Sequence, residues 1–285
     1  HLAAGEGGDL GGQIDRRTFL ERAAKFAVGG LTAVALLDLL SPKYALAAEV
    51  PKEDARVKSE YVKYPSPNGS GEMRGLFAKP AGATGKLPGV IVVHENRGLN
   101  PYIEDVVRRV ALAGYVAFGP DALYPLGGYP GTDPEGQKMQ SSLDGKKITE
   151  DFVAATEFLH KHADCNGKIG VTGFCYCGGM ANTLAWRLPD IVKAAAPYYG
   201  GQPSAENAAK IKGALLLHYA GLDTRVNAGW PAYETALKAA NIPYEAFIYP
   251  EVNHGFHNDT TPRYDAAAAK LSWERTLTFF KKNLA

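Results

Sequence analysis

The strongest constraint on the fold is an alternation of short apolar runs with helical patterns between residues 89 and 283. The predicted strands are Gly89–His94, Tyr115–Phe118, Lys168–Gly173, Ala194–Tyr199, Ala214–Tyr219 and Tyr244–Tyr249. The predicted helices are Ile103–Ala113, Ile148–His160, Met180–Arg187, Trp230–Ala240 and Tyr264–Asn283. Short continuous apolar strands separated by amphipathic helices predict an α/β fold, with a mostly parallel central sheet and helices on both faces.

Two further strands are predicted before this alternation begins. Residues Arg56–Tyr64 and Met73–Lys79 have strand patterns, and the turn between them is rich in Pro, Asn, Ser and Gly. Such a turn between two strand patterns predicts an N-terminal antiparallel hairpin. The chain shows no internal repeat and no domain linker after its first part, so we expect residues 48–285 to form one domain.

The first 47 residues have a different pattern. The pair Arg16-Arg17 precedes an apolar stretch, Phe26–Leu37, and a small-residue sequence, Ala45–Ala47. This combination is typical of a twin-arginine export leader. The apolar stretch has twelve residues, fewer than the about 20 that a spanning helix needs. We therefore expect residues 1–47 to direct export to the periplasm, with only transient membrane contact; the alternative is an amphipathic helix of the mature protein.

Composition excludes several other classes of protein. The 31 basic and 30 acidic residues leave a net charge of +1, whereas nucleic-acid binders usually carry a basic patch. The three cysteines are too few for a disulfide scaffold, and no Cys/His group has zinc-ligand spacing. We expect a monomer or homodimer that uses no metal, no cofactor and no nucleic acid.

The turn after the predicted strand Lys168–Gly173 places Cys175 among small residues. A glycine-rich strand-to-helix turn around one nucleophile is typical of a nucleophile elbow. Cys177 stands where a glycine is usual, and the N–H of Tyr176 would face a developing oxyanion. The dipole of the following helix would favour a thiolate. A buried cysteine is more often a small apolar packing residue, which is the interpretation we give Cys165.

A cysteine hydrolase also needs a base and a group that orients it. Asp223 follows the predicted strand Ala214–Tyr219, and His254 follows the predicted strand Tyr244–Tyr249. The order nucleophile, acid, histidine is that of the α/β-hydrolases. A capping Asp and a surface His are the alternatives, and His94 and His257 are weaker candidates for the base.

At these residues the sequence resembles the dienelactone hydrolase family of α/β-hydrolases. Gly173–Tyr176 followed by glycines is similar to the cysteine elbow of the family, and Asn253–Phe256 to its histidine loop. His94–Leu99 looks like a third motif, in which the family carries a glutamate after strand three. The resemblance covers residues 56–285 and implies an α/β-hydrolase fold.

The resemblance also implies roles for individual residues. It implies a catalytic triad of Cys175 as nucleophile, Asp223 as orienter and His254 as base. Glu95 would hydrogen-bond the resting thiol, and the N–H groups of Asn96 and Tyr176 would form the oxyanion hole. The arginines with which the family archetype binds a substrate carboxylate are not matched; Asn258, four residues after His254, occupies one such position. The residues expected to line the substrate pocket are Arg97, Tyr124, Tyr198, Tyr199, Trp230 and Phe256.

The function predicted from these residues is hydrolysis of a small-molecule ester or lactone through a thioester on Cys175. Two alternatives stay open from the sequence. One is a thiol redox protein that uses Cys175 and Cys177, although their spacing is not that of a thioredoxin-like motif. The other is an inactive binding protein that keeps the hydrolase fold.

Overall fold

The computed structural model describes residues 48–175 and 178–285, and within these ranges lies a sheet of eight strands. The strands are β1 (Val57–Ser66), β2 (Gly71–Pro80), β3 (Leu87–Val93), β4 (Val116–Pro120), β5 (Cys165–Phe174), β6 (Val192–Tyr198), β7 (Ala214–Ala220) and β8 (Tyr244–Tyr249). The longer helices are α4 (Pro101–Leu112), α5 (Asp133–Ser141), α6 (Gly145–Lys161), α7 (Gly178–Arg187), α10 (Trp230–Ala239) and α11 (Ala266–Leu284). The predicted leader, Tyr176 and Cys177 lie outside the described residues.

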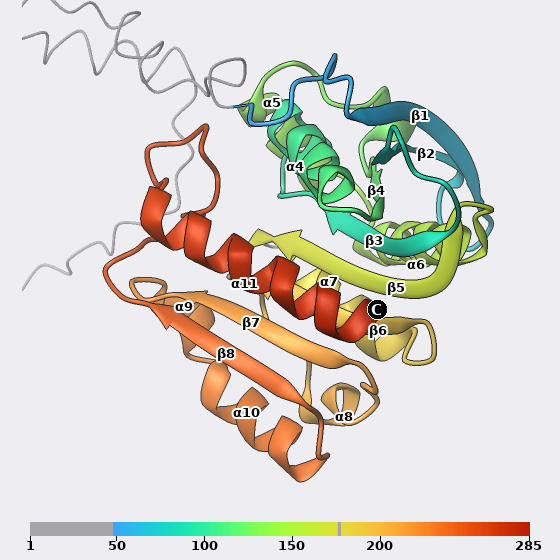
Figure 1. Ribbon diagram of the computed structural model, residues 1–285. Coiled ribbons are helices and arrows are strands. Elements are labelled where there is room, and N and C mark those ends of the chain that lie inside the picture. Colours follow the sequence, from blue (N-terminus) through green and yellow to red (C-terminus); the bar gives the residue numbers. More distant parts are fainter. Residues whose placement is uncertain (1–47, 176–177) are drawn as a thin grey trace, which may run out of the picture. The chain divides into compact units, whose positions relative to one another are not determined.

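The strands follow the order β1-β2-β4-β3-β5-β6-β7-β8 across the sheet (Figure 1). β2 pairs antiparallel with both β1 and β4, and the other neighbouring strands are parallel. The predicted α/β fold, with its mostly parallel sheet and N-terminal hairpin, is confirmed. Because β3 and β5 to β8 run in the same direction, their carboxyl ends meet at one edge, where loops bring distant residues together.

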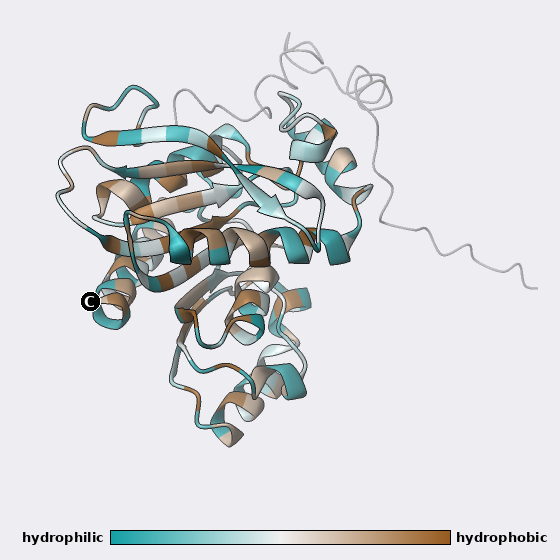
Figure 2. Ribbon diagram, turned by 90° about the vertical axis from the view of Figure 1, so that its right-hand side faces the viewer, coloured by the Kyte–Doolittle hydropathy of each residue, from teal (hydrophilic) through white to brown (hydrophobic). Residues whose placement is uncertain are grey.

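Helices cover both faces of the sheet, and the alternation of side chains along each strand divides the core between the two faces. In β3, Ile91 and Val93 belong to the cluster with α6 and α7, whereas Val90 and Val92 belong to the cluster with α4 and α11. The helices in Figure 2 carry both hydrophilic and hydrophobic segments, as expected of helices with one buried face. No helix in the described part of the chain is long and apolar enough to cross a membrane.

Four helical elements after the strands were not predicted from the sequence. They are α5, the 3-10 turn η1 (Tyr124–Leu126), α8 (Ala205–Ala208) and α9 (Thr224–Asn227). α5 buries only Gly136 and Gln140, so it has no apolar stripe to reveal it. The other three are single turns, too short for any periodicity to appear. All four lie in the connections that follow β4, β6 and β7.

A buried histidine lies between the sheet and α11. The two ring nitrogens of His218, on β7, lie 2.9 Å from the hydroxyl of Tyr249 and 3.0 Å from that of Thr276. Burial lowers the pKa of His218 well below the ordinary value of histidine. Burial also lowers the pKa of His94, and that of His257 to about 3. The folded protein therefore holds these three rings neutral.

Neutral buried histidines make stability depend on pH. The unfolded chain binds protons below a histidine pKa of about 6.5, and the folded protein does not. Stability is therefore complete above this pH and decreases as the pH falls. For His218 and His257, whose pKa values are lowered most, we expect the free energy of unfolding to fall by about 1.4 kcal/mol per pH unit below about pH 6. Urea denaturation of the full chain at pH 7.5, 6.0 and 5.0 measures this decrease.

The variant His218→Gln isolates one of these groups, because glutamine can still hydrogen-bond to both hydroxyls but does not titrate. Its stability should fall less steeply with decreasing pH than that of the unaltered protein, by about 1.4 kcal/mol per unit. Parallel curves for the two proteins would contradict the assignment of His218 as a ring held neutral by burial.

Candidate active site

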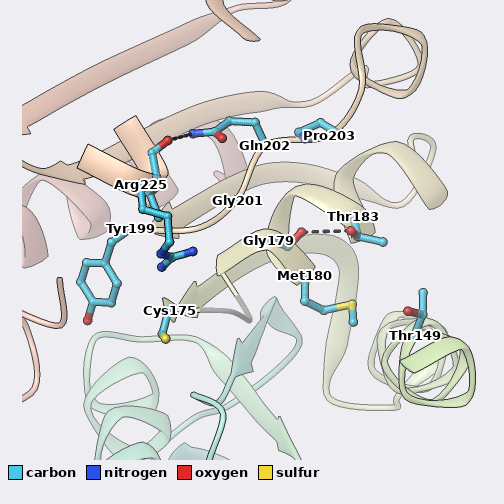
Figure 3. A pocket seen from close by; sticks show the side chains of 11 residues that line it. Thr149, Cys175, Gly179, Met180, Thr183, Tyr199, Gly201, Gln202, Pro203 and Arg225 are labelled. Atoms are coloured by element: carbon cyan, nitrogen blue, oxygen red, sulfur yellow. Dashed lines mark hydrogen bonds between the residues drawn. The ribbon is translucent and has the colours of Figure 1, made fainter. Parts of the chain in front are cut away.

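Cys175 lies in the turn between β5 and α7, at the carboxyl edge of the sheet. Its φ angle is 62°, in the left-handed region that costs free energy for any residue with a Cβ atom. The side chain is half-buried and its sulfur points into a cavity (Figure 3). A reactive side chain is thus presented by a strained turn at the edge where strand ends gather.

The turn is held in place by a close contact between two backbones. A Cβ atom on Gly200, in the loop after β6, would lie 2.2 Å from the carbonyl carbon of Gly178, the first residue of α7. A Cβ atom on Gly178 would lie 2.6 Å from the carbonyl oxygen of Tyr198. Both distances are shorter than any real Cβ contact, so only glycines allow the first turn of α7 to pack on this loop.

Asp223 and His254 form a hydrogen-bonded pair after β7 and β8. His254 Nδ1 lies 2.5 Å from Asp223 Oδ2, and the two side chains are 17% and 7% exposed. The other oxygen of the carboxylate, Oδ1, accepts the N–H of Val226 at 3.2 Å. Because both oxygens are bonded, the carboxylate has one orientation, and Nε2 is left as the ring nitrogen that can exchange protons.

Tyr199 lies beside His254 and lines the cavity that Cys175 also lines. Its ring centroid lies 4.9 Å from that of His254. Burial raises the pKa of Tyr199 well above its ordinary value, and the charges of Glu95 and Cys175 act in the same direction. The hydroxyl has no hydrogen-bond partner in the described part of the chain. The loops after the four parallel strands β5 to β8 thus bring these residues together at the carboxyl edge of the sheet.

Glu95 lies in the loop after β3 and is 3% exposed. Its Oε2 accepts a hydrogen bond of 2.8 Å from the side-chain amide of Asn258. The side-chain oxygen of Asn258, Oδ1, in turn accepts hydrogen bonds from the backbone N–H and the hydroxyl of Thr260. Asn258 was noted in the sequence only as a departure from the family archetype, and its contact with Glu95 was not predicted. Its position four residues after the histidine was the only available signal.

Arg97 points toward acidic groups. Its Nη1 lies 2.7 Å from Oδ2 of Asp133, on α5, and 3.7 Å from Oε2 of Glu95. Asp133 also accepts a hydrogen bond from the hydroxyl of Tyr129. A Cβ atom on Gly136 would lie 2.4 Å from the carbonyl oxygen of Arg97, so α5 packs directly on this backbone. The unpredicted helix α5 therefore fixes the loop after β3.

His94 connects this loop with the loop after β4. Its Nδ1–H donates to the carbonyl of Glu95 at 2.6 Å, and its Nε2 accepts the N–H of Ala122 at 3.2 Å. These bonds occupy both nitrogens of a fully buried ring. Asn96 is half-buried in the same loop, whereas Tyr176 lies outside the described residues, so the oxyanion hole stays a prediction.

The cavity beside Cys175 has a volume of about 320 Å³. It is lined by Thr149, Cys175, Gly179, Met180, Thr183, Tyr199, Gly201, Gln202, Pro203, Arg225 and Val226. Most of these residues come from elements around β5, β6 and β7, and Gln202 and Arg225 were not predicted as site residues. No group of potential metal ligands occurs in residues 48–175 and 178–285.

Of the six residues expected to line the pocket, Tyr199 lines this cavity and the other five do not. Tyr198 and Phe256 are fully buried in the core, and Trp230 packs on Tyr219. Tyr124 lies under the guanidinium of Arg74, and Arg97 faces Asp133 and Glu95, as described above. Side chains alternate in direction along a strand, and this explains why the two neighbouring tyrosines differ. Tyr198 points toward α11, where its hydroxyl bonds to Thr276, and the next residue, Tyr199, faces the site.

An eight-stranded sheet of this order, with a strained cysteine turn and an Asp–His pair at the carboxyl ends, defines the chain as an α/β-hydrolase. The model of the dienelactone hydrolase family matches residues 73–284. The chain therefore belongs to the dienelactone hydrolase family and is a carboxylic ester or lactone hydrolase of that type.

Individual relatives agree with this assignment. The "Putative hydrolase fragment YghX" of Escherichia coli K12 is 60% identical over 114 residues, which are 40% of this chain and 97% of the relative. A "Putative carboxymethylenebutenolidase" of Escherichia coli O157:H7 is 32% identical, over 76% of this chain and 84% of that protein. A crystal structure described as a putative dienelactone hydrolase from Klebsiella pneumoniae superposes with a TM-score of 0.69 at 27% identity, covering 79% of this chain and 99% of that one.

The contact between α5 and the loop after β3 can be tested with Gly136→Ala. The added methyl group must displace the backbone of Arg97, and with it Glu95 and Asn96. Since small displacements of catalytic groups cost up to about a hundredfold in rate, we expect kcat/KM for 4-nitrophenyl butyrate to fall by about tenfold or more.

A matched control is Gly145→Ala, in the first turn of α6, where a Cβ atom would meet nothing within 4 Å. This variant should retain the activity of the unaltered protein. Thermal unfolding of both variants separates a local effect from general loss of the fold. Equal activities in the two alanine variants would show that α5 does not position the loop.

Proposed function

We propose that the protein hydrolyses an ester or lactone bond through a thioester intermediate on Cys175. The observation that carries this proposal is the 2.5 Å contact between Asp223 and His254 next to a cavity lined by a strained cysteine. A carboxylate that orients an imidazole near a nucleophile is the arrangement by which enzymes of several folds transfer acyl groups. No cofactor enters this chemistry.

In the first half of the reaction the Cys175 thiol gives its proton to His254 Nε2. The sulfur attacks the carbonyl carbon, a C–S bond forms, and the carbonyl oxygen becomes an oxyanion facing the N–H groups of Asn96 and Tyr176. Collapse of this intermediate breaks the C–O bond, and His254 protonates the departing alkoxide. Asp223 stabilises the imidazolium that exists between these two proton transfers.

In the second half water hydrolyses the thioester. His254 takes a proton from the water molecule, whose oxygen attacks the thioester carbonyl carbon. The C–S bond then breaks, the carboxylic acid leaves, and Cys175 recovers its proton. Glu95 has a distinct role in this proposal: it accepts a hydrogen bond from the resting thiol and favours ionisation when substrate arrives. Its buried position next to Asn258 is compatible with that role.

Substitution of the nucleophile tests the proposal directly. Cys175→Ala should abolish hydrolysis of 4-nitrophenyl butyrate, because no other group can form the thioester. In the unaltered protein, mass spectrometry after brief mixing with the ester should detect the acyl group on Cys175. The control Cys177→Ala should retain most of the activity, because in this mechanism that thiol does not react.

Persistent hydrolysis in Cys175→Ala would refute the thioester mechanism. A large loss in Cys177→Ala, combined with a change in thiol titre on reduction, would instead favour a redox function for the two cysteines.

We also propose that residues 1–47 direct export to the periplasm by the twin-arginine route. Replacing both Arg16 and Arg17 with Lys should keep the protein in the cytoplasm of a bacterial host, since the segment has no net positive charge to compensate. Cell fractionation followed by the ester assay measures the distribution. Unchanged periplasmic activity in this variant would contradict the proposed route.

A further inference from the structure

The loop after β8 holds a charged group that the proposed mechanism does not use. Asp259 follows Asn258, the residue whose side-chain amide donates to Glu95. Oδ2 of Asp259 lies 2.6 Å from Nη2 of Arg109, on α4, and the two side chains are 10% and 6% exposed. The other oxygen of Asp259, Oδ1, is buried without a hydrogen-bond partner in the described part of the chain. Arg109 is therefore the group that holds this carboxylate in place.

A second contact joins the same loop to α4. Nδ1 of His257 lies 2.7 Å from the hydroxyl of Tyr102, in the first turn of α4. His257 and Asp259 are the two neighbours of Asn258 in the chain, so both residues that flank Asn258 are bonded to this one helix. The position of α4 therefore sets the position of the amide that donates to Glu95.

The residues of α4 that hold the loop lie along one stripe of the helix. Tyr102, Asp105 and Arg109 are spaced by three and four residues, which places them on the same face. Asp105 is buried between the other two, and its Oδ2 accepts a 2.7 Å hydrogen bond from Nε of Arg109. Asp105 thus orients the guanidinium that meets Asp259.

Two residues near the start of the described chain complete this group of contacts. The N–H of Val50 donates to Oδ1 of Asp105 at 2.8 Å, and the N–H of Glu49 donates to Oδ2 at 3.1 Å. The carbonyl of Val50 accepts a 2.6 Å hydrogen bond from Nε of Arg108, and the carboxylate of Glu49 lies 3.1 Å from Nη1 of Arg109. The side chain of Val50 is buried in the same core cluster as α4. The segment is therefore fixed to α4 by both backbone and side chain.

We propose that Glu49 and Val50 are positioning residues of the hydrolase. They fix α4 through Asp105, and α4 in turn fixes the loop after β8 through Arg109. The inference rests on the proposed function, in which the buried Glu95 acts on the resting thiol. None of these groups lines the cavity beside the cysteine, so they act on the reaction only through the groups that they hold.

This role also bears on the proposed export leader. The leader ends at residue 47, and the positioning segment begins at Glu49. Cleavage at the end of the leader would therefore leave both positioning residues on the mature protein, whereas cleavage after Val50 would remove them.

Asp259→Ala tests the connection between α4 and the loop after β8. The variant should fold, because Arg109 keeps its ion pair with Asp105. Since small displacements of catalytic groups cost up to about a hundredfold in rate, we expect kcat for 4-nitrophenyl butyrate to fall by about tenfold, with little change in KM.

Two variants of the full chain test the segment itself. Val50→Pro removes one N–H that Asp105 accepts and keeps an apolar side chain, and Val50→Gly keeps the N–H but removes the side chain from the core. Each should lower kcat in the same direction as Asp259→Ala, by a smaller factor. The control Asp164→Ala removes a carboxylate that pairs with Lys79 immediately before β5, at the opposite edge of the sheet, and should leave kcat unchanged.

A double-mutant cycle distinguishes positioning from a general loss of stability. Asn258→Ala removes the amide that donates to Glu95 and should itself lower kcat. If Asp259 acts through Asn258, adding Asp259→Ala to this variant should lower kcat by no more than about twofold, because the contact that it supports is already gone. Independent effects would instead multiply, and kcat would fall by about a further tenfold.

The outcomes separate this inference from the proposed function. Unchanged kcat in Asp259→Ala or in both Val50 variants, with only a lower temperature of thermal unfolding, would overturn the inference alone. Unchanged kcat in Asn258→Ala, or effects that multiply in the cycle, would also overturn it. Hydrolysis of the ester by Cys175→Ala would instead refute the proposed function.

Discussion

The carboxylate of Asp223 is the group on which the site depends most. One oxygen orients the imidazole of His254, and the other caps the short helix α9 through the N–H of Val226. The carboxylate is 7% exposed, so it interacts with these partners where water competes little. A single side chain therefore both orients the imidazole of His254 and anchors the turn from which Arg225 enters the cavity.

The site around this carboxylate is assembled from loops that the parallel sheet brings to one edge. Close backbone packing then fixes each loop: Gly178 against Gly200 at the cysteine turn, and Gly136 against Arg97 at the loop after β3. Such contacts need glycine because a Cβ atom would overlap with the facing backbone. The strained φ angle of Cys175 persists because these neighbours leave the turn no alternative conformation.

Much of this site was predictable from the sequence, and the parts that were not have physical reasons. The triad candidates follow apolar strands directly, so strand periodicity alone locates them at the sheet edge. Which of the expected aromatic residues line the cavity was not predictable in this way, because a one-residue step along a strand reverses the direction of a side chain. Tyr198 accordingly lies in the core, and Tyr199 faces the cavity. Helices α5 and α9 lack apolar periodicity, so their contributions were invisible in the sequence.

The sequence by itself determined the fold class, the succession of the eight strands and five longer helices along the chain, and the family, because these depend on periodicity and on motifs that are local in the chain. Tertiary structure decided which polar groups meet: Asn258 with Glu95, and Asp133 with Arg97. It also decided that Asp259 meets Arg109. Pairings of this kind join residues that are far apart in sequence, and their geometry exists only after the loops have packed at the carboxyl edge of the sheet.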